Sequence, residues 1–101
     1  MVRTRIGNAD DFEEGCKKAL TVDWKSVLIV KKDGKIYALE GRCSHMGIPL
    51  DRGTVVDATI RCPGHGAVFD LATGKRLQNL QAKDIKSYKV TQEGDELYID
   101  L

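Results

Sequence analysis

Two short segments that contain cysteine and histidine, separated along the chain, constrain this protein more than any other feature. They are residues 43–47 (CSHMG) and 62–66 (CPGHG), with sixteen residues between the first histidine and the second segment's cysteine. Both histidines of the chain and two of its three cysteines lie in these segments. Thiolates and imidazoles bind zinc, copper and iron–sulfur clusters. The pattern therefore predicts one metal site, delivered by two loops, with four ligands: Cys43, His45, Cys62 and His65.

The order of the ligands distinguishes the candidate metals. Zinc sites with two cysteines and two histidines usually present a cysteine pair followed by a histidine pair. Here each loop carries one cysteine and one histidine. A two-iron cluster would use this mixed order, because each loop could then give a thiolate to one iron and an imidazole to the other. We therefore expect a 2Fe–2S cluster and keep a structural zinc site as the alternative.

The remaining composition narrows the class of protein. A chain of 101 residues is expected to form one domain, and its net charge of +1 shows no basic excess of the kind that nucleic-acid binding needs. The N-terminus shows no signal pattern, and the longest aliphatic run, residues 27–30, is far too short to span a membrane. With Cys43 and Cys62 as ligands, Cys16 remains a free thiol or small core residue. We expect a soluble, cytoplasmic protein without membrane or nucleic-acid partners.

The hydrophobic pattern is mostly that of β-structure. No long helical period or internal repeat is present, and Asp33-Gly34 is a strong hairpin signal. Trp24 and the tyrosines are expected in the core or on sheet faces. The fold class is therefore all-β, with a framework of residues 1–42 and 80–101 and a ligand-bearing insert at about 43–79. Strands are expected at residues 2–6, 20–22, 26–31, 36–39, 55–56, 59–61, 68–70, 85–91 and 96–101.

The Cys-x-His and Cys-x-x-His segments resemble the signature of Rieske iron–sulfur proteins. The likeness includes further residues that the family shares: Gly47, Pro49, Leu50, Gly53, Pro63, Gly66, Phe69, Asp70, Thr73 and Gly74. The resemblance implies the Rieske fold over residues 1–101, with antiparallel β-sheets and a small cluster-binding subdomain. It also implies that Cys43 and Cys62 bind the inner iron, and that His45 and His65 bind the outer iron with their ring edges toward solvent.

Several residues around these ligands have expected supporting roles. Gly47, Gly64 and Gly66 would let backbone N–H groups approach the cluster sulfurs, whereas Gly53 and Gly74 could be ordinary turn glycines. A small apolar docking surface is expected around the imidazole edges. Its members would be Met46, Ile48, Pro49 and Gly64.

Departures from the high-potential branch of the family indicate a low reduction potential. Those proteins carry a disulfide at the positions of Ile48 and Gly64, and serine and tyrosine hydroxyls at those of Ala67 and Phe69. With fewer donors to the reduced cluster, we expect a potential of about −150 mV rather than about +300 mV. Many relatives also cover the cluster with a proline-containing loop. Residues 79–84 contain no proline, and Leu80 is the candidate for that cover.

The expected function follows from the resemblance. A low-potential Rieske protein would carry one electron at a time from a flavin- or nicotinamide-linked reductase to a terminal oxygenase. No acid–base or nucleophilic group stands out, and the chain is too short for an oxygenase's own mononuclear-iron domain, so we do not expect an enzyme. The alternatives are a small iron–sulfur subunit of a larger oxidoreductase, such as nitrite reductase, and a structural zinc module.

Overall fold

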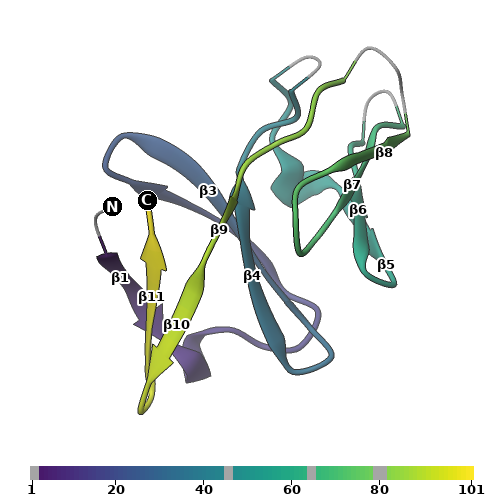
Figure 1. Ribbon diagram of the computed structural model, residues 1–101. Helices are drawn as coiled ribbons and strands as arrows, with labels where there is room; N and C mark the ends of the chain where they lie inside the picture. The colour runs from purple at the N-terminus through teal and green to yellow at the C-terminus, as the bar shows by residue number, and fades with distance from the viewer. Residues whose placement is uncertain (1–2, 45–46, 64–65, 79–81) are drawn as a thin grey trace.

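A computed structural model describes residues 3–44, 47–63, 66–78 and 82–101, and Figure 1 shows how they are arranged. Within these ranges the chain forms three antiparallel sheets and two single-turn 3-10 helices, η1 (Ala9–Asp11) and η2 (Leu50–Arg52). No helix in this part of the chain is long and apolar enough to cross a membrane. The expected all-β fold is confirmed.

The three sheets divide the chain between its ends and its middle. The first contains, in spatial order, β1 (Arg3–Asn8), β11 (Glu96–Asp100) and β10 (Val90–Glu93). The second contains β2 (Lys17–Val22), β3 (Lys25–Lys32), β4 (Lys35–Glu40) and β9 (Ser87–Tyr88). The third is built wholly from the middle of the chain, with β5 (Thr54–Val56), β6 (Thr59–Arg61), β7 (Val68–Asp70) and β8 (Arg76–Gln78).

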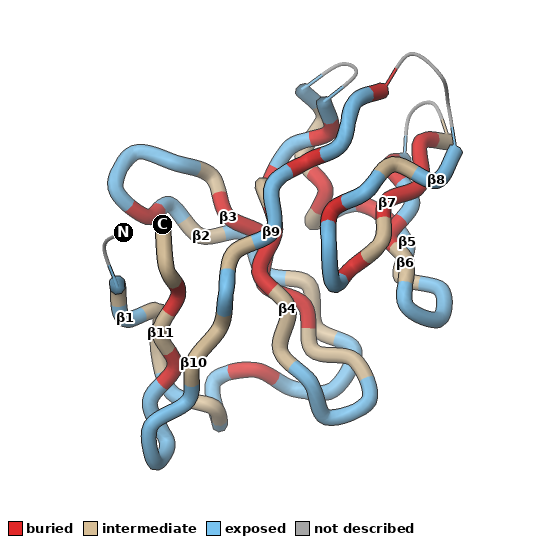
Figure 2. The backbone as a smooth tube through the Cα atoms, viewed as in Figure 1, coloured by how far each residue is buried: buried red, intermediate tan, exposed pale blue. Residues whose placement is uncertain are grey.

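Strand β3 lies at the centre of the molecule, and other parts of the chain cover both of its faces. Its run Val27, Leu28, Ile29 and Val30 is fully buried, and Figure 2 shows this stretch in red. Successive side chains of a strand point to opposite faces, so a strand buried on both sides reads as a continuous apolar run. The two faces of β3 accordingly supply two different cores.

One core lies between the second and third sheets, and the other lies between the first and second. The core toward the third sheet, called the cysteine core here, contains Leu28, Val30, Leu39, Cys43, Leu50, Ile60, Cys62, Ala67, Phe69, Leu71, Ala82 and Ile85. The core toward the first sheet contains Phe12, Val22, Val27, Ile29, Ala38, Leu97 and Ile99. Both candidate cysteine ligands therefore lie in the same core.

Tight turns join β2 to β3 and β3 to β4 in the second sheet. The expected Asp33-Gly34 hairpin is present, with positive φ at both residues. The Glu14 carboxylate accepts hydrogen bonds from the backbone N–H groups of Asp33 (2.6 Å) and Gly34 (3.0 Å). These backbone donors favour the charged carboxylate and lower the pKa of Glu14. The turn is thus fastened to the segment before β2.

Trp24 is not in the core or on a sheet face, and that expectation is wrong. It lies at the tip of the β2–β3 hairpin, and 98% of it is exposed. Asp23 and Trp24 both have positive φ (49° and 68°), as a two-residue hairpin turn requires. The turn carries the indole beyond the ends of both strands, away from either core.

The expected single strand over residues 85–91 is in fact divided between two sheets. Strand β9 pairs with β4, with Tyr88 opposite Ala38, and β10 pairs with β11, with Val90 opposite Ile99. Lys89 separates the two strands. A local pattern of apolar residues indicates extended chain here, but the change of partner depends on contacts distant in sequence.

Candidate metal centre

Cys43 and Cys62 lie where two loops leave the sheets. Cys43 follows β4 after two residues, and Cys62 directly follows β6. The segments after β4, after β6 and before β9 run toward the same end of the molecule (Figure 1). Both cysteines are almost fully buried, with 2% and 1% exposure, in the cysteine core. The structure thus brings the two expected thiolate ligands to one region.

Each of the two loops is closed by a backbone hydrogen bond of the same type. The N–H of Cys43 donates to the carbonyl of Ile48 at 2.8 Å, and the N–H of Cys62 donates to that of Ala67 at 2.8 Å. In each case the acceptor lies five residues after the cysteine. Gly47 and Gly66 have φ of +67° and +71°, which only glycine adopts without cost. Each loop therefore doubles back directly beside its cysteine.

Glycine also fixes the first loop to the framework. A Cβ on Gly41 would lie 2.1 Å from the Ser26 Oγ atom and 3.0 Å from the Ser26 carbonyl carbon, so a side chain at position 41 would displace the Ser26 side chain and crowd its backbone. The Gly41 N–H donates to the Ser26 carbonyl and the Gly41 carbonyl accepts from the N–H of Leu50, both at 2.9 Å. Arg42 adds a hydrogen bond from its Nη1 atom to the Gly47 carbonyl (3.0 Å). The base of the loop is thereby held to β3 and to the start of η2.

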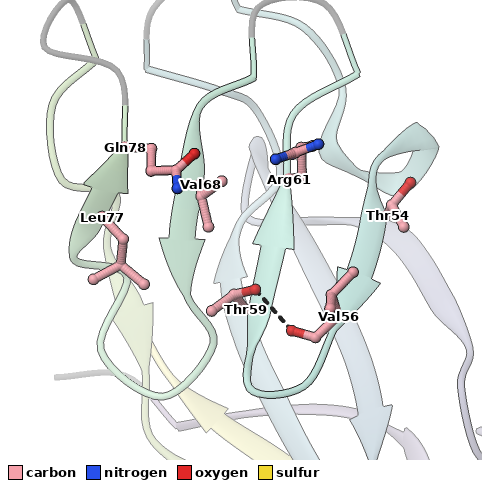
Figure 3. Close-up of a pocket in the computed structure, with 7 residues that line it drawn as sticks. All are labelled: Thr54, Val56, Thr59, Arg61, Val68, Leu77 and Gln78. Carbon is pink, nitrogen blue, oxygen red and sulfur yellow. Dashed lines mark hydrogen bonds between the residues drawn. The ribbon is translucent and has the colours of Figure 1, made fainter.

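The third sheet carries the second loop. One face of this sheet packs against the cysteine core, and the other face lies on the outside of the molecule. Ile60 and Phe69 pair across β6 and β7 and are fully buried in the cysteine core. The alternate residues face the other way and line the outer groove drawn in Figure 3, and neither candidate cysteine is among them. Its lining residues are Thr54, Val56, Thr59, Arg61, Val68, Leu77 and Gln78. The groove and the cysteines therefore belong to opposite faces of the sheet.

Residues 82–86, called the strap here, have no regular secondary structure but are hydrogen-bonded to the third sheet. The Arg76 N–H donates to Asp84 Oδ1 at 2.8 Å, and Arg76 Nη1 donates to the Ala82 carbonyl at 3.1 Å. The Ile85 N–H donates to the Gly74 carbonyl at 2.9 Å. Residues on and before β8 thus hold one side of the strap.

The strap is also held by β4 and by the first cysteine loop. The Lys86 N–H donates to Glu40 Oε1 (2.6 Å), and the Lys86 carbonyl accepts from the Glu40 N–H (2.9 Å). Ser44 bonds both backbone groups of Lys83 through its hydroxyl. Burial, and secondarily the Glu40 carboxylate, raise the pKa of Tyr88 just beyond the strap. The strap therefore links the second sheet, the third sheet and the candidate site.

The expected site residues other than Cys43, Cys62, Gly47 and Gly66 fall into three groups. His45, Met46, Gly64, His65 and Leu80 lie outside the described residues. Ala67 and Phe69 are fully buried in the cysteine core, and neither side chain has a polar hydrogen to offer a sulfur atom. Ile48 and Pro49 are half-buried, and Ile48 packs against the cysteine core.

The expectation that Gly53 and Gly74 are ordinary turn glycines is wrong. A Cβ on Gly53 would lie 2.4 Å from the Arg61 carbonyl oxygen, and one on Gly74 would lie 2.0 Å from the Ile85 carbonyl oxygen. Both positions require glycine because another part of the backbone passes too close for a side chain. The roles of Ser44 and of the strap had no local sequence signal, because their partners are distant in the chain.

The chemistry of the described residues fits an iron–sulfur cluster. All three cysteines are described, and none forms a disulfide; Cys16 is half-buried, apart from the other two. Cys43 and Cys62 offer two thiols in one water-excluded core, as the thiolate half of a mixed ligand set requires. Among residues 3–44, 47–63, 66–78 and 82–101 no group of three or more His, Cys, Asp or Glu could hold a metal ion.

Comparison with known proteins identifies the class. Residues 2–89 match the model of the Rieske [2Fe-2S] domain, so the chain belongs to this family. A solved ferredoxin of carbazole 1,9a-dioxygenase from Nocardioides aromaticivorans has the same fold, with a TM-score of 0.90 and 28% identity over 98% of this chain and 97% of that one. The expected Rieske fold and a single Rieske-type 2Fe–2S cluster are thereby confirmed.

Two kinds of curated relative differ in size. The chain is 38% identical over 93 residues to the 3-phenylpropionate/cinnamic acid dioxygenase ferredoxin subunit of Shigella flexneri. This match covers 90% of this chain and 86% of that protein. It is 32% identical over 99 residues to human apoptosis-inducing factor 3, covering 97% of this chain. In that second case the chain spans only 16% of the relative's length.

Proposed function

We propose that this protein is a low-potential one-electron carrier that receives electrons from a flavin- or nicotinamide-linked reductase and delivers them to a terminal oxygenase. The carrying observation is the pair of buried thiols, Cys43 and Cys62, at the ends of two matched loops in a Rieske domain. Relatives of nearly the same length are named as ferredoxin components of dioxygenase systems. By this proposal the chain is likewise a redox component and carries out no substrate chemistry of its own.

The proposed ligand set is Cys43 and Cys62 for the inner iron and His45 and His65 for the outer iron. When bound, the cluster supplies the transfer of one electron. The protein buries both thiols, so that water does not reach their side of the site. The imidazole edges, with Met46, Ile48, Pro49 and Gly64 around them, would form the surface that partners contact.

The proposed low potential rests on what surrounds the second cysteine. Ala67 and Phe69 are fully buried in the core that contains Cys62, and neither side chain can donate a hydrogen bond to sulfur. Because such donors stabilise the more negative reduced cluster, their absence at these two positions lowers the potential. A potential near the low end of the Rieske range, about −150 mV, matches delivery from nicotinamide-linked reductases.

The domain partition and the cellular setting complete the proposal. Residues 43–79 would form the cluster-binding insert, and 1–42 with 80–101 the framework; the third sheet lies wholly within this insert. No disulfide joins the three cysteines, in keeping with a reducing compartment such as the cytoplasm. The formal charge of +1 and the even mixture of charges give no support for a nucleic-acid partner.

A second candidate function is a fixed electron-transfer unit of a larger oxidoreductase, with the small subunit of a nitrite reductase as the example. One observation favours it: almost the whole chain matches a segment that makes up only 16% of human apoptosis-inducing factor 3. In that setting the electron partner would be permanently attached. Exchange with partners therefore separates the two candidates.

The experiment measures exchange directly. Purified holoprotein is added in substoichiometric amounts to a reductase, nicotinamide cofactor and the terminal oxygenase of a naphthalene dioxygenase system, and the molecular mass of the native protein in extracts is measured in parallel. A carrier elutes at its own mass and supports many oxygenase turnovers per molecule. The fixed unit would be established instead if the native protein co-elutes with a large subunit and if each added molecule delivers no more than one electron to the oxygenase.

A further inference from the structure

The 82–86 strap covers the cysteine core although it lacks the stiffening of proline. Ala82 and Ile85 are 1% and 3% exposed and belong to the same core as Cys43 and Cys62. The strap is not a β-strand and belongs to none of the three sheets. Its position therefore depends on individual hydrogen bonds to neighbouring parts of the chain.

Ser44 makes the bond that reaches from the strap to the first cysteine loop. Its Oγ atom accepts a hydrogen bond from the Lys83 N–H at 2.8 Å and donates one to the Lys83 carbonyl at 2.5 Å. One hydroxyl thus satisfies both backbone groups of Lys83. Ser44 itself directly follows Cys43 and directly precedes the proposed ligand His45.

The opposite side of the strap is held independently of the cysteine loop. Asp84 accepts from the Arg76 N–H, and Ile85 is pressed against Gly74 and bonds to its carbonyl. With this side anchored, loss of the Ser44 bond would release Lys83 and its neighbours without detaching the whole segment. Ser44 therefore controls one edge of the cover.

We propose that Ser44 is a positioning residue that clamps the strap over the cysteine core and so shields the cluster's thiolate ligands from water. Solvent exposure is one of the determinants of iron–sulfur potentials, since water stabilises the added negative charge of the reduced cluster. Releasing the clamp raises the potential and speeds loss of the cluster. The inference rests on the ligand set proposed above.

The test uses the Ser44→Ala holoprotein beside two matched variants. Ser44→Thr keeps the hydroxyl, and Ser87→Ala removes an exposed hydroxyl from the strand that follows the strap. In hydrogen exchange, the Lys83 amide of Ser44→Ala should exchange about tenfold faster than in the wild type, since two modest hydrogen bonds are lost. The visible absorbance of the Ser44→Ala holoprotein should decay faster than that of the wild type in the presence of an iron chelator, and its reduction potential should be higher. The other two variants should behave like the wild type.

The outcome that refutes the Ser44 clamp differs from the one that refutes the ligand set. A Ser44→Ala holoprotein whose Lys83 exchange, chelator resistance and potential all equal those of the wild type would refute the clamp. Wild-type protein that holds no iron would refute the ligand set instead. If Ser44→Ala fails to assemble a cluster, Ser44→Thr, which keeps the hydroxyl, must still assemble one and must protect the Lys83 amide as the wild type does; a Ser44→Thr holoprotein with fast Lys83 exchange would also refute the clamp.

Discussion

Gly74 and Ile85 are in closer contact than any other residue at position 74 would allow. A Cβ atom on Gly74 would fall 2.0 Å from the Ile85 carbonyl oxygen, and the Ile85 N–H bonds to the Gly74 carbonyl at 2.9 Å. Gly74 also has a φ of +76°. This contact joins the turn between β7 and β8 to the strap, and through it to the second sheet.

Replacing Gly74 by alanine should therefore destabilise the fold more than replacing a glycine that needs only its positive φ. We expect Gly74→Ala to reduce the free energy of unfolding by about 3 kcal/mol or more, because strain and a backbone clash combine. Gly94, with φ +59° and open space around it, is the control and should cost about 1 kcal/mol. Urea unfolding measures both. Equal costs for the two variants would contradict the close contact.

Glu14 should stabilise the β3–β4 hairpin in a pH-dependent way. The backbone N–H groups of Gly34 and Asp33 lower the pKa of its carboxyl in the folded state. The stabilisation is therefore fully present above the unfolded pKa, about 4.3, and is lost as pH falls through the lower folded value. Glu14→Gln should lower the melting temperature at pH 7 but show little difference from the wild type near about pH 2.

Glu13→Gln is the matched control, because among the described residues it is the carboxylate of Glu14, and not that of neighbouring Glu13, that accepts the hydrogen bonds of the turn. It should leave the melting temperature nearly unchanged at both pH values. A Glu14→Gln difference that is as large in acid as at neutral pH would rule out the charged carboxylate as the source of the stability.

Adding a hydroxyl beside the second cysteine should raise the reduction potential. Ala67 is fully buried in the core that contains Cys62, and its carbonyl closes the Cys62 loop. A hydrogen bond from Ala67→Ser to a charged sulfur is worth about 1.4 kcal/mol, or about 60 mV for one electron. Val68→Thr puts a hydroxyl on the outer groove instead and should leave the potential unchanged. Equal potentials for Ala67→Ser and the wild type would remove the basis for the low-potential assignment.

Changing the cysteines one at a time should separate ligands from bystanders. Cys43→Ser and Cys62→Ser should each abolish normal cluster assembly, since a buried thiolate ligand is lost. Cys16, half-buried against the other core, should tolerate serine with full iron and sulfide content. Iron and acid-labile sulfide analysis of the purified variants gives the answer. Loss of the cluster in Cys16→Ser, or its retention in Cys43→Ser, would overturn the ligand set.

Local patterns in the sequence were sufficient to predict the parts of the structure that depend on neighbouring residues. The continuous apolar run of β3, the Asp33-Gly34 hairpin and the short strands beside Cys62 are all confirmed. Cys43 and Cys62 were predicted as ligands from their spacing to histidine, and this stays a prediction; the structure places both in one core.

Features that depend on distant contacts could not be predicted in this way. Gly53 and Gly74 are required because separate backbone segments approach them, which no local pattern records. Trp24 was misplaced because its apolar side chain favours burial, whereas the two-residue turn that contains it carries it into solvent. The strap, with partners up to 46 residues away, had no local signal either.

The most direct test of the account is the visible spectrum of the oxidised protein followed by electron paramagnetic resonance after reduction. A 2Fe–2S cluster with two thiolates on one iron and two imidazoles on the other should be red-brown, should bleach on reduction, and should give a signal of lower average g value than an all-cysteine cluster. A colourless protein that contains zinc without iron or sulfide, or a signal typical of four cysteine ligands, would contradict it.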